Sequence, residues 1–397
     1  MTQAKNHPLE GIRVLDLGRY QAGPRCALMF ARMGAEVIKI ESLTGDESRK
    51  NPPVVRGQSA YWVQYNSGKK SLSINLRTDE GKEVLRDLVK ESDILLQNFR
   101  PGTIEKMGFG YETLKDLNEK IIMINVSAYG QTGSYRDRVG FDPLGQALGG
   151  MMSLNGEPDG PPIRNFFPLI DRITALHGCI GALAALYERQ FSGQGQTIDV
   201  SLGDTGFTVN EIPISAFLGD GIIQGKTGNG MGMDNSYQTS DGWILMAATN
   251  RKMWERCCEA LGWDDWVNDP KFEGRNDRRE NHKIIEERLI PWFKSKTTEE
   301  AVDFLNKFSV PIAPINDVVG ASINPLIEER EMMMEVPDKI AGKIHVTGKS
   351  IKFGRTPMTV GSAPTIGEHT KQILTDILGY DESKIENLES DNIIRCD

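Results

Sequence analysis

The sequence is poor in residues that bind metals or cross-link secreted proteins. Its 397 residues include five cysteines and five histidines. The cysteines are odd in number and show no CxxC spacing, which is typical of reduced cytosolic thiols rather than of a disulfide framework or a zinc site. The histidines are scattered, without an HExxH motif or a paired spacing. We therefore expect a cytoplasmic protein without a catalytic metal.

Excess positive charge and long apolar runs are also missing. The formal net charge of -9 at pH 7 argues against general nucleic-acid binding, because that requires a basic surface. The longest apolar run, around residues 178–187, is too short for a membrane span and is rich in alanine and glycine, which favours a core helix. The first seven residues contain no apolar core of a signal peptide. We expect neither a nucleic-acid nor a membrane partner.

The composition is that of an ordinary globular protein, and its length suggests two or three domains. Strand and helix patterns alternate in the first half, which predicts an α/β fold with a parallel sheet that binds ligands at the carboxyl ends of its strands. We expect strands at residues 12–17, 36–41, 93–99, 121–129 and 196–202, with helices ending at Met33 and spanning residues 78–90.

The alternation is lost near residue 219. A glycine-rich segment follows, and then a hairpin at residues 237–248 that turns at Asp241-Gly242. We interpret residues 1–219 as a large α/β domain, 220–232 as a linker or lid, and 233–324 as a smaller α+β domain. Helices are predicted in the smaller domain at residues 251–261, 281–296 and 298–308.

Asp171 is the most informative residue. It follows the apolar segment 166–170 and stands at the start of a predicted helix over residues 172–190. Unpaired backbone N–H groups and the helix dipole there favour the ionised carboxylate. An ionised, partly desolvated carboxylate can attack an activated acyl group. Taken alone, Asp171 is better explained as an N-cap, because capping aspartates far outnumber catalytic ones.

Two sets of residues are spaced along this helix. The residues with large side chains form an apolar stripe, and the residues with small side chains allow close packing against a neighbouring element. The large residues are Ile173, Leu176, Ile180, Leu183 and Leu186; the small ones are Ala175, Gly178, Gly181, Ala182 and Ala185. His177 lies six residues beyond Asp171, on a different face, so we expect it to be structural.

Several loops offer groups for an anionic, aromatic ligand. Gln21-Ala22-Gly23-Pro24 closes the first strand, either as a ligand-binding turn or only as a tight turn with Pro24 at the helix start. Phe99 and Arg100 are candidates for stacking on a purine, and basic residues are candidates for phosphates. Each basic residue is explained equally well as part of a solvated loop. The basic candidates are Lys69, Lys70, Lys106, Arg136 and Arg138. Asp142 is most simply an N-cap.

Together these segments resemble the class III CoA-transferases, which include formyl-CoA transferase, carnitine CoA-transferase and the α-methylacyl-CoA racemases. The resemblance runs nearly end to end, and its ordered set of motifs is specific although no single motif is decisive. It is carried by residues 9–16, Gln21-Ala22-Gly23-Pro24, residues 34–41, Asn98-Phe99-Arg100-Pro101-Gly102, residues 193–200 and residues 363–370.

The resemblance implies ping-pong transfer of CoA from an acyl-CoA to a carboxylic acid, without a permanently bound cofactor. Asp171 would be the covalent nucleophile, passing through a mixed anhydride and an aspartyl-CoA thioester, with the Gln21 amide beside the reacting carbonyl. Asn98, Phe99 and Lys106 match positions that contact the CoA nucleotide. Ala22, Lys70, Leu72, Arg100 and Arg138 complete the CoA-binding set that we expect.

The resemblance also implies a large Rossmann-like domain built from both termini, to which residues 325–397 return, and an interlocked dimer. The dimer would contain two copies of the chain or this chain and a homologous subunit. Two motifs depart from the family pattern. Ser42 replaces an Arg after the second strand, and Gly228-Asn229-Gly230-Met231-Gly232-Met233 replaces the four-glycine lid of formyl-CoA transferase, which makes a formyl/oxalate role doubtful.

Two alternatives remain open. The first is an acyl-CoA racemase or epimerase, which uses a His in a Gly-His-Asp segment; it is disfavoured because this chain has Gly140-Phe141-Asp142. The second is a CoA-binding subunit of a hetero-oligomer. For a transferase, Phe166 and Phe167 favour an aromatic acid, while Arg136, Arg138 and Arg164 favour a second carboxylate. Succinyl-CoA as donor and an aryl-substituted succinate such as benzylsuccinate as acceptor fit both expectations.

Overall fold

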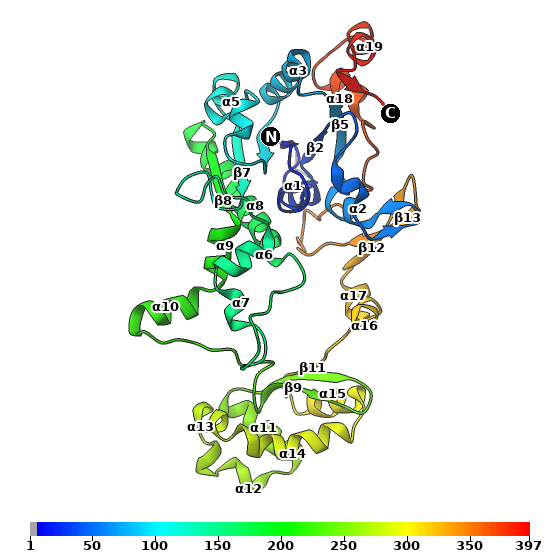
Figure 1. Cartoon of the computed structure of the whole chain (residues 1–397). Coiled ribbons are helices and arrows are strands. Elements are labelled where there is room, and N and C mark those ends of the chain that lie inside the picture. The colour runs from blue at the N-terminus through cyan, green and yellow to red at the C-terminus, as the bar shows by residue number, and fades with distance from the viewer. Residues whose placement is uncertain (1–5) are drawn as a thin grey trace. The chain divides into compact units, whose positions relative to one another are not determined.

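The computed structural model describes residues 6–397, which form two compact units (Figure 1). The first unit contains the chain up to Met151, Arg164–Gly221 and Leu326–Asp397. The second contains Met152–Ile163 and Ile222–Pro325. The chain thus leaves the first unit twice, and residues 152–163 cluster with the second unit.

The first unit is built on a seven-stranded sheet in the order β14-β5-β2-β1-β6-β7-β8. Six strands are parallel, and the C-terminal β14 is antiparallel to β5. This order is that of a doubly wound, Rossmann-like sheet, so the predicted α/β class and its construction from both ends of the chain are confirmed. The strands are β1 (Arg13–Asp16), β2 (Glu36–Glu41), β5 (Lys70–Ile74), β6 (Ile94–Gln97), β7 (Ile122–Ser127), β8 (Thr197–Ser201) and β14 (Ile394–Arg395).

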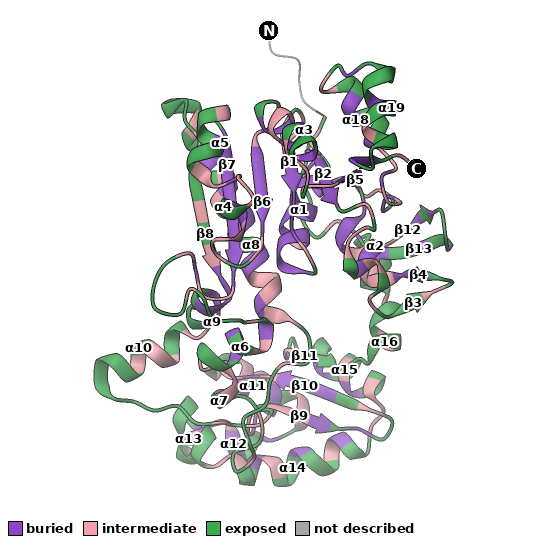
Figure 2. Cartoon of the chain, turned by 45° about the horizontal axis from the view of Figure 1, so that its top comes forward, coloured by how far each residue is buried: buried purple, intermediate pink, exposed green. Residues whose placement is uncertain are grey.

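Alternation along the strands sends apolar side chains to both faces of the sheet. Val14 points to one face, where α1 (Ala22–Arg32) and α8 (Leu169–Ser192) pack. Leu15 points to the other face, which is covered by α3 (Asp79–Lys90), α18 (Thr370–Asp376) and α19 (Glu382–Ser390). Both faces are therefore shielded from solvent, and the central strands are almost wholly buried (Figure 2).

Helix α8 packs through its small residues rather than its large ones. Its buried face includes Ala175, Gly178 and Ala182, and a Cβ atom at Gly178 would lie 3.2 Å from the Cys26 sulfur on α1. The predicted apolar stripe faces outward at two of its residues, since Leu176 is 38% and Ile180 62% exposed. The helix is long and apolar enough to cross a membrane by length and composition alone, but in this fold it packs against α1, β7 and β8.

The second unit is a small α+β structure. Its sheet is antiparallel, in the order β11-β10-β9, and the predicted hairpin is confirmed by β9 (Asp234–Gln238) and β10 (Trp243–Ala247). Strand β11 (Ile312–Pro314) completes the sheet. The helices α11 (Arg251–Leu261), α14 (His282–Lys294) and α15 (Thr298–Lys307) enclose a core that contains Trp254 and Phe293.

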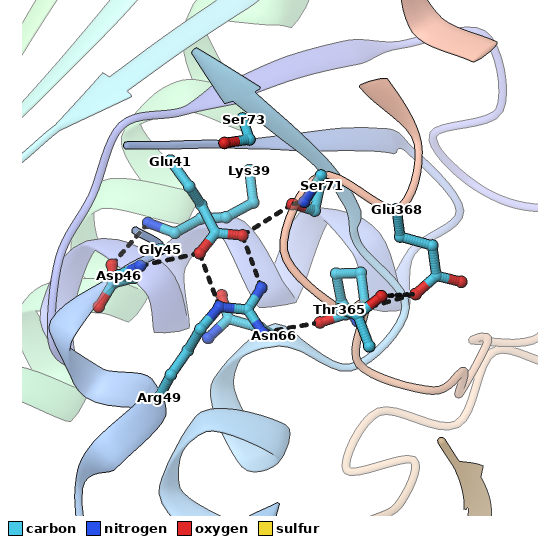
Figure 3. A network of polar contacts seen from close by, with 12 residues as sticks. Lys39, Glu41, Gly45, Asp46, Arg49, Asn66, Ser71, Ser73, Thr365 and Glu368 are labelled. Carbon is cyan, nitrogen blue, oxygen red and sulfur yellow. Dashed lines mark hydrogen bonds and ion pairs between the residues drawn. The ribbon is translucent and has the colours of Figure 1, made fainter. Parts of the chain in front are cut away.

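Buried ion pairs hold the loop at the carboxyl end of β2 (Figure 3). The Lys39 ammonium lies 3.1 Å from Asp46 Oδ2, and Arg49 lies 2.6 Å from Glu41 Oε1. Glu41 also accepts hydrogen bonds from the backbone N–H of Asp46 and from the Ser71 hydroxyl. The loop after β2 is thereby held in place for whatever binds beside it.

A second buried pair corrects one prediction. The Lys69 ammonium is fully buried, lies 2.7 Å from Asp16 Oδ2 and donates to the carbonyl of Pro24 and to Asn66 Oδ1. All three of its protons are used within the fold. The expectation that Lys69 meets a phosphate is therefore wrong, because the segment before β5 is part of the core rather than a solvated loop.

Replacing this lysine tests the pair. We expect Lys69→Ala to lower the free energy of unfolding by about 3–5 kcal/mol, because Asp16 would be left charged and unpaired in the core. Urea unfolding measures the change. The matched control is Lys82→Ala on α3, whose ammonium lies 3.6 Å from the 95% exposed Asp79; it should cost under about 0.5 kcal/mol. Equal effects of the two substitutions would contradict a dominant buried pair.

Candidate active site

Two adjoining cavities lie at the carboxyl ends of the parallel strands, where such sheets bind ligands. One, here the Asp171 cavity, has a volume of about 380 Å³; the other, the Ser42 cavity, has about 700 Å³. Arg19 and Phe99 line both. The Asp171 cavity also includes Gln21, Ala22, Asn98, Arg100, Arg136, Arg138 and Phe141, and the Ser42 cavity includes residues 42–47, 74–77 and Met107.

Asp171 is held at the start of α8 by a second acid. The helix begins at Leu169 after Pro168, so Asp171 is its third residue and the N-cap interpretation is wrong. Its backbone N–H donates to Asp142 Oδ2 at 2.9 Å. Asp142 is itself the first residue of α6 (Asp142–Leu148) rather than its N-cap, and its other oxygen accepts from the Gln146 amide. Asp142 therefore satisfies an N–H group of the other helix.

The electrostatic environment of Asp171 differs from the prediction. Burial and the neighbouring Asp142 carboxylate raise the pKa of Asp171 to about 7, and Arg172 opposes them only partly. This direction is opposite to the expectation that the helix start favours the ionised form, because desolvation and the like charge of Asp142 disfavour ionisation. The carboxyl group is thus poised to gain or lose a proton near neutral pH, as is common at reactive sites.

Gln21 touches the segment that leads into α8. Its side chain is 4% exposed and donates from Nε2 to the Pro168 carbonyl at 3.3 Å, three residues before Asp171. Glycine at position 23 allows a close approach here, because a Cβ atom would lie 3.0 Å from the Gly18 Cα and 3.2 Å from the Asn98 side chain. The turn after β1 therefore brings the Gln21 amide to the wall that carries Asp171.

The expected CoA-binding residues after β6 divide into two roles. The Asn98 amide accepts from the Arg19 N–H at 2.7 Å and donates to the Arg19 carbonyl at 2.9 Å, so it clamps the loop after β1. Phe99 stands where the two cavities meet. Arg100 and Arg138 line the Asp171 cavity, and the Arg138 guanidinium stacks on Tyr135 at 3.5 Å from the ring centre.

Three expected binding residues lie elsewhere. Lys70 is at the amino end of β5, where it pairs with Glu36 at 2.6 Å. Leu72 is wholly buried in the sheet, and Lys106 is exposed on α4 (Thr103–Lys106). The three residues line neither of the two cavities. The cavities therefore give no support to these three residues as CoA contacts, which stay predictions.

The carboxyl end of β5 supplies residues that sequence reasoning missed. Asn75, Leu76 and Arg77 line the Ser42 cavity, together with Arg19 from the turn after β1. The alternation of Ser71-Leu72-Ser73-Ile74 is a strand signal that would have placed them at a ligand-binding edge. Arg19 and Arg77 are basic groups in the region where Ser42 replaces the family's arginine.

The Asp171 cavity does not present the acid–base pair of a racemase in the segment where the family places it. Phe141 lines the cavity with 67% of its surface exposed and carries no titratable group. The His177 ring instead faces the Thr205 hydroxyl, with Nδ1 at 3.3 Å.

Comparison with known proteins agrees with this geometry. A family model described as CoA-transferase family III matches residues 9–370. The chain belongs to CoA-transferase family III. Succinyl-CoA--D-citramalate CoA-transferase of Chloroflexus aurantiacus is 34% identical, over 99% of this chain and 100% of that protein. Formyl-CoA:oxalate CoA-transferase of Escherichia coli O157:H7 is 30% identical, over 98% and 99%.

Solved structures share the fold. A CAIB/BAIF family protein from Brucella suis superposes with a TM-score of 0.84 at 31% identity, over 94% of this chain and 100% of that one. Rv3272 from Mycobacterium tuberculosis gives 0.82 at 28% identity, over 92% and 98%. The protein is thus a CoA-transferase, whose substrates are CoA thioesters and acids.

The raised pKa of Asp171 makes a prediction about stability. An aspartate has a pKa of about 3.9 when unfolded, so the folded protein binds the extra proton between about pH 4 and pH 7. That contribution to stability is complete below about pH 4, is lost progressively as the pH rises from about 4 to about 7, and is absent above that range. As the pH rises from 5 to 8, we expect the free energy of unfolding of Asp171→Asn to increase relative to that of the wild type by on the order of 2 kcal/mol. Urea unfolding at each pH measures the difference.

Asp142→Asn serves as the comparison variant. It removes one of the two causes that raise the pKa of Asp171 while keeping an oxygen that can accept the Asp171 N–H. The loss of stability with rising pH should therefore move to lower pH in this variant. An unchanged pH profile in both variants would show that Asp171 does not titrate near pH 7.

Proposed function

We propose that the protein transfers CoA from an acyl-CoA to a free carboxylic acid through covalent intermediates on Asp171. The observation that carries the proposal is a partly buried carboxyl group on the wall of a cavity at the carboxyl edge of the sheet, in a chain of this family. Burial limits solvation of the ionised carboxylate and so favours its attack on an activated acyl carbon.

The first half-reaction loads CoA onto the enzyme. The Asp171 carboxylate attacks the donor thioester; the C–S bond breaks, CoA leaves as thiolate, and a mixed anhydride remains. The thiolate then attacks the aspartyl carbonyl, forming the aspartyl-CoA thioester and releasing the donor acid. In the second half, the acceptor carboxylate attacks this thioester, and the thiolate takes the new acyl group from the second anhydride. Each step exchanges activated acyl bonds, so no ATP is consumed.

The residues that line the two cavities have separate roles in the proposed mechanism. In this proposal the Gln21 amide, which now donates to Pro168, turns to the oxyanion that develops in each attack. The nucleotide part of CoA lies along the Ser42 cavity, where Arg19 and Arg77 meet phosphates and Phe99 contacts the adenine or pantetheine. The Asp171 cavity then holds the acyl end.

The substrates follow from the relatives and from this cavity. Relatives act on succinyl-CoA with D-citramalate or L-malate. We take succinyl-CoA as donor and a dicarboxylic acid as acceptor; the exposed Phe141 in the cavity favours an aryl-substituted succinate such as benzylsuccinate.

The active form is an interlocked cytoplasmic dimer. Its second chain is another copy or a homologous subunit, as the relative named a beta subunit suggests, and light scattering on the purified chain decides between them.

The nucleophile is tested by mass spectrometry. After incubation with a panel of acyl-CoAs, we expect a CoA adduct on the peptide that carries Asp171. Asp171→Asn should lose the adduct and CoA transfer, because an amide cannot form the anhydride. Full transfer activity in Asp171→Asn would refute the assignment. Exchange of the α-proton with deuterated water, without an acid acceptor, would instead favour the racemase alternative.

The proposed role of the Gln21 amide is tested by removing it. We expect Gln21→Ala to lower kcat on the order of 100-fold with little change in KM, because one donor to the oxyanion is lost while CoA binding remains. Steady-state kinetics with succinyl-CoA measures both constants. A change confined to KM would mean that Gln21 only helps to bind substrate.

A further inference from the structure

A fully buried glutamine on α6 holds the segment that leads into α8. The Gln146 side chain is 0% exposed, and its Oε1 accepts from the Asn165 N–H at 2.8 Å. Its Nε2 donates to the Asn165 carbonyl at 3.3 Å and to Asp142 Oδ1. Asp142 in turn accepts from the Asp171 N–H. Both ends of residues 165–171 are therefore bound to one helical turn of α6, because Asp142 and Gln146 are four residues apart.

The middle of this segment is held in a different way. Asn165 Oδ1 accepts from the Phe167 N–H at 3.0 Å, and the Pro168 carbonyl accepts from the Gln21 amide at 3.3 Å. In the proposed mechanism Gln21 turns to the oxyanion, so its bond to Pro168 is lost during the reaction. The bonds that Gln146 and Asp142 make involve no group that the mechanism moves. They remain in place while Asp171 reacts.

Helix α6 is itself closely packed, which makes it a rigid support for the segment. It packs against α9 (Leu202–Val209), where a Cβ atom at Gly149 would lie 2.1 Å from the Gly206 carbonyl carbon. The buried Thr174 hydroxyl of α8 donates to the Thr205 hydroxyl of α9 at 2.9 Å. Backbone contacts this close leave α6 no room to slide. Displacement of residues 165–171 therefore requires the loss of their hydrogen bonds to α6.

We infer that Gln146 is a positioning residue for the reaction: through Asn165 and Asp142 it keeps the Asp171 carboxyl group where it can attack the thioester. The reacting atoms must approach to about 3–3.5 Å, and a displacement of about 1 Å can slow a reaction on the order of 100-fold. Gln146 lines neither cavity, so it acts through the segment rather than on the substrate. This inference rests on the proposed CoA-transferase function.

The test measures the first half-reaction, which needs no acceptor, in Gln146→Met. Methionine keeps the length of the side chain but cannot donate a hydrogen bond. The dimeric or complexed enzyme is mixed with succinyl-CoA at several concentrations, and mass spectrometry follows the CoA adduct on Asp171. We expect the rate constant at saturation to fall on the order of 30-fold. The succinyl-CoA concentration for half-maximal rate and the final fraction of loaded chains should not change, because binding and folding are retained.

A second buried glutamine provides the matched control. Gln58 is 7% exposed, donates to Asp338 Oδ2 at 3.0 Å and accepts from the Ser59 N–H at 2.9 Å. It therefore joins a buried carboxylate to the backbone as Gln146 does, but lines neither cavity and holds no part of residues 165–171. Both Gln58→Met and Gln146→Met should lower the urea midpoint of unfolding, whereas Gln58→Met should load at the wild-type rate. Equal loading rates in the two variants would overturn the inference.

Asn165→Ala tests the same segment at a partly exposed side chain, which the fold tolerates more easily. It removes the hydrogen bond to the Phe167 N–H, and we expect loading to slow on the order of fivefold. If Gln146→Met does not fold, loading of Asn165→Ala at the wild-type rate overturns the inference. Absence of an adduct on the wild type would refute the proposed function and the inference with it, whereas normal loading in both segment variants refutes the inference alone.

Discussion

Close packing of α8 against α1 and the sheet is the constraint on which the site depends. Alanine and glycine on the buried face let the helix approach α1 so closely that a Cβ atom at Gly178 would meet the Cys26 sulfur. That approach brings the first turn of α8 to the turn after β1, where Gln21 reaches Pro168. The position of Asp171 thus depends on the close approach of α8 to α1 at Gly178, two turns further along the helix, rather than on contacts of its own carboxyl group.

The charged residues around the site fall into two groups, one of oppositely charged pairs and one of neighbours with like charge. Beneath the loops, Lys39, Lys69, Asp16 and Asp46 are buried as compensated pairs and hold the carboxyl edge rigid. Nearer the cavity, Asp171 lies close enough to Asp142, and Arg25 close enough to Arg172, for each like charge to shift the pKa of its neighbour. Uncompensated charge near a cavity is unfavourable in the free protein, and a ligand of complementary charge relieves it.

The sequence allowed the α/β class, most strand positions and the importance of Asp171 to be predicted, because these follow from local periodicity and ordered motifs. It misled where tertiary packing decides. The large residues of α8 face outward at Leu176 and Ile180 because the small ones fit the sheet better. Lys69 is an interior ion-pair partner, which no local pattern reveals. The pKa of Asp171 depends on Asp142, 29 residues away in the chain, so the helix start alone gave the wrong direction.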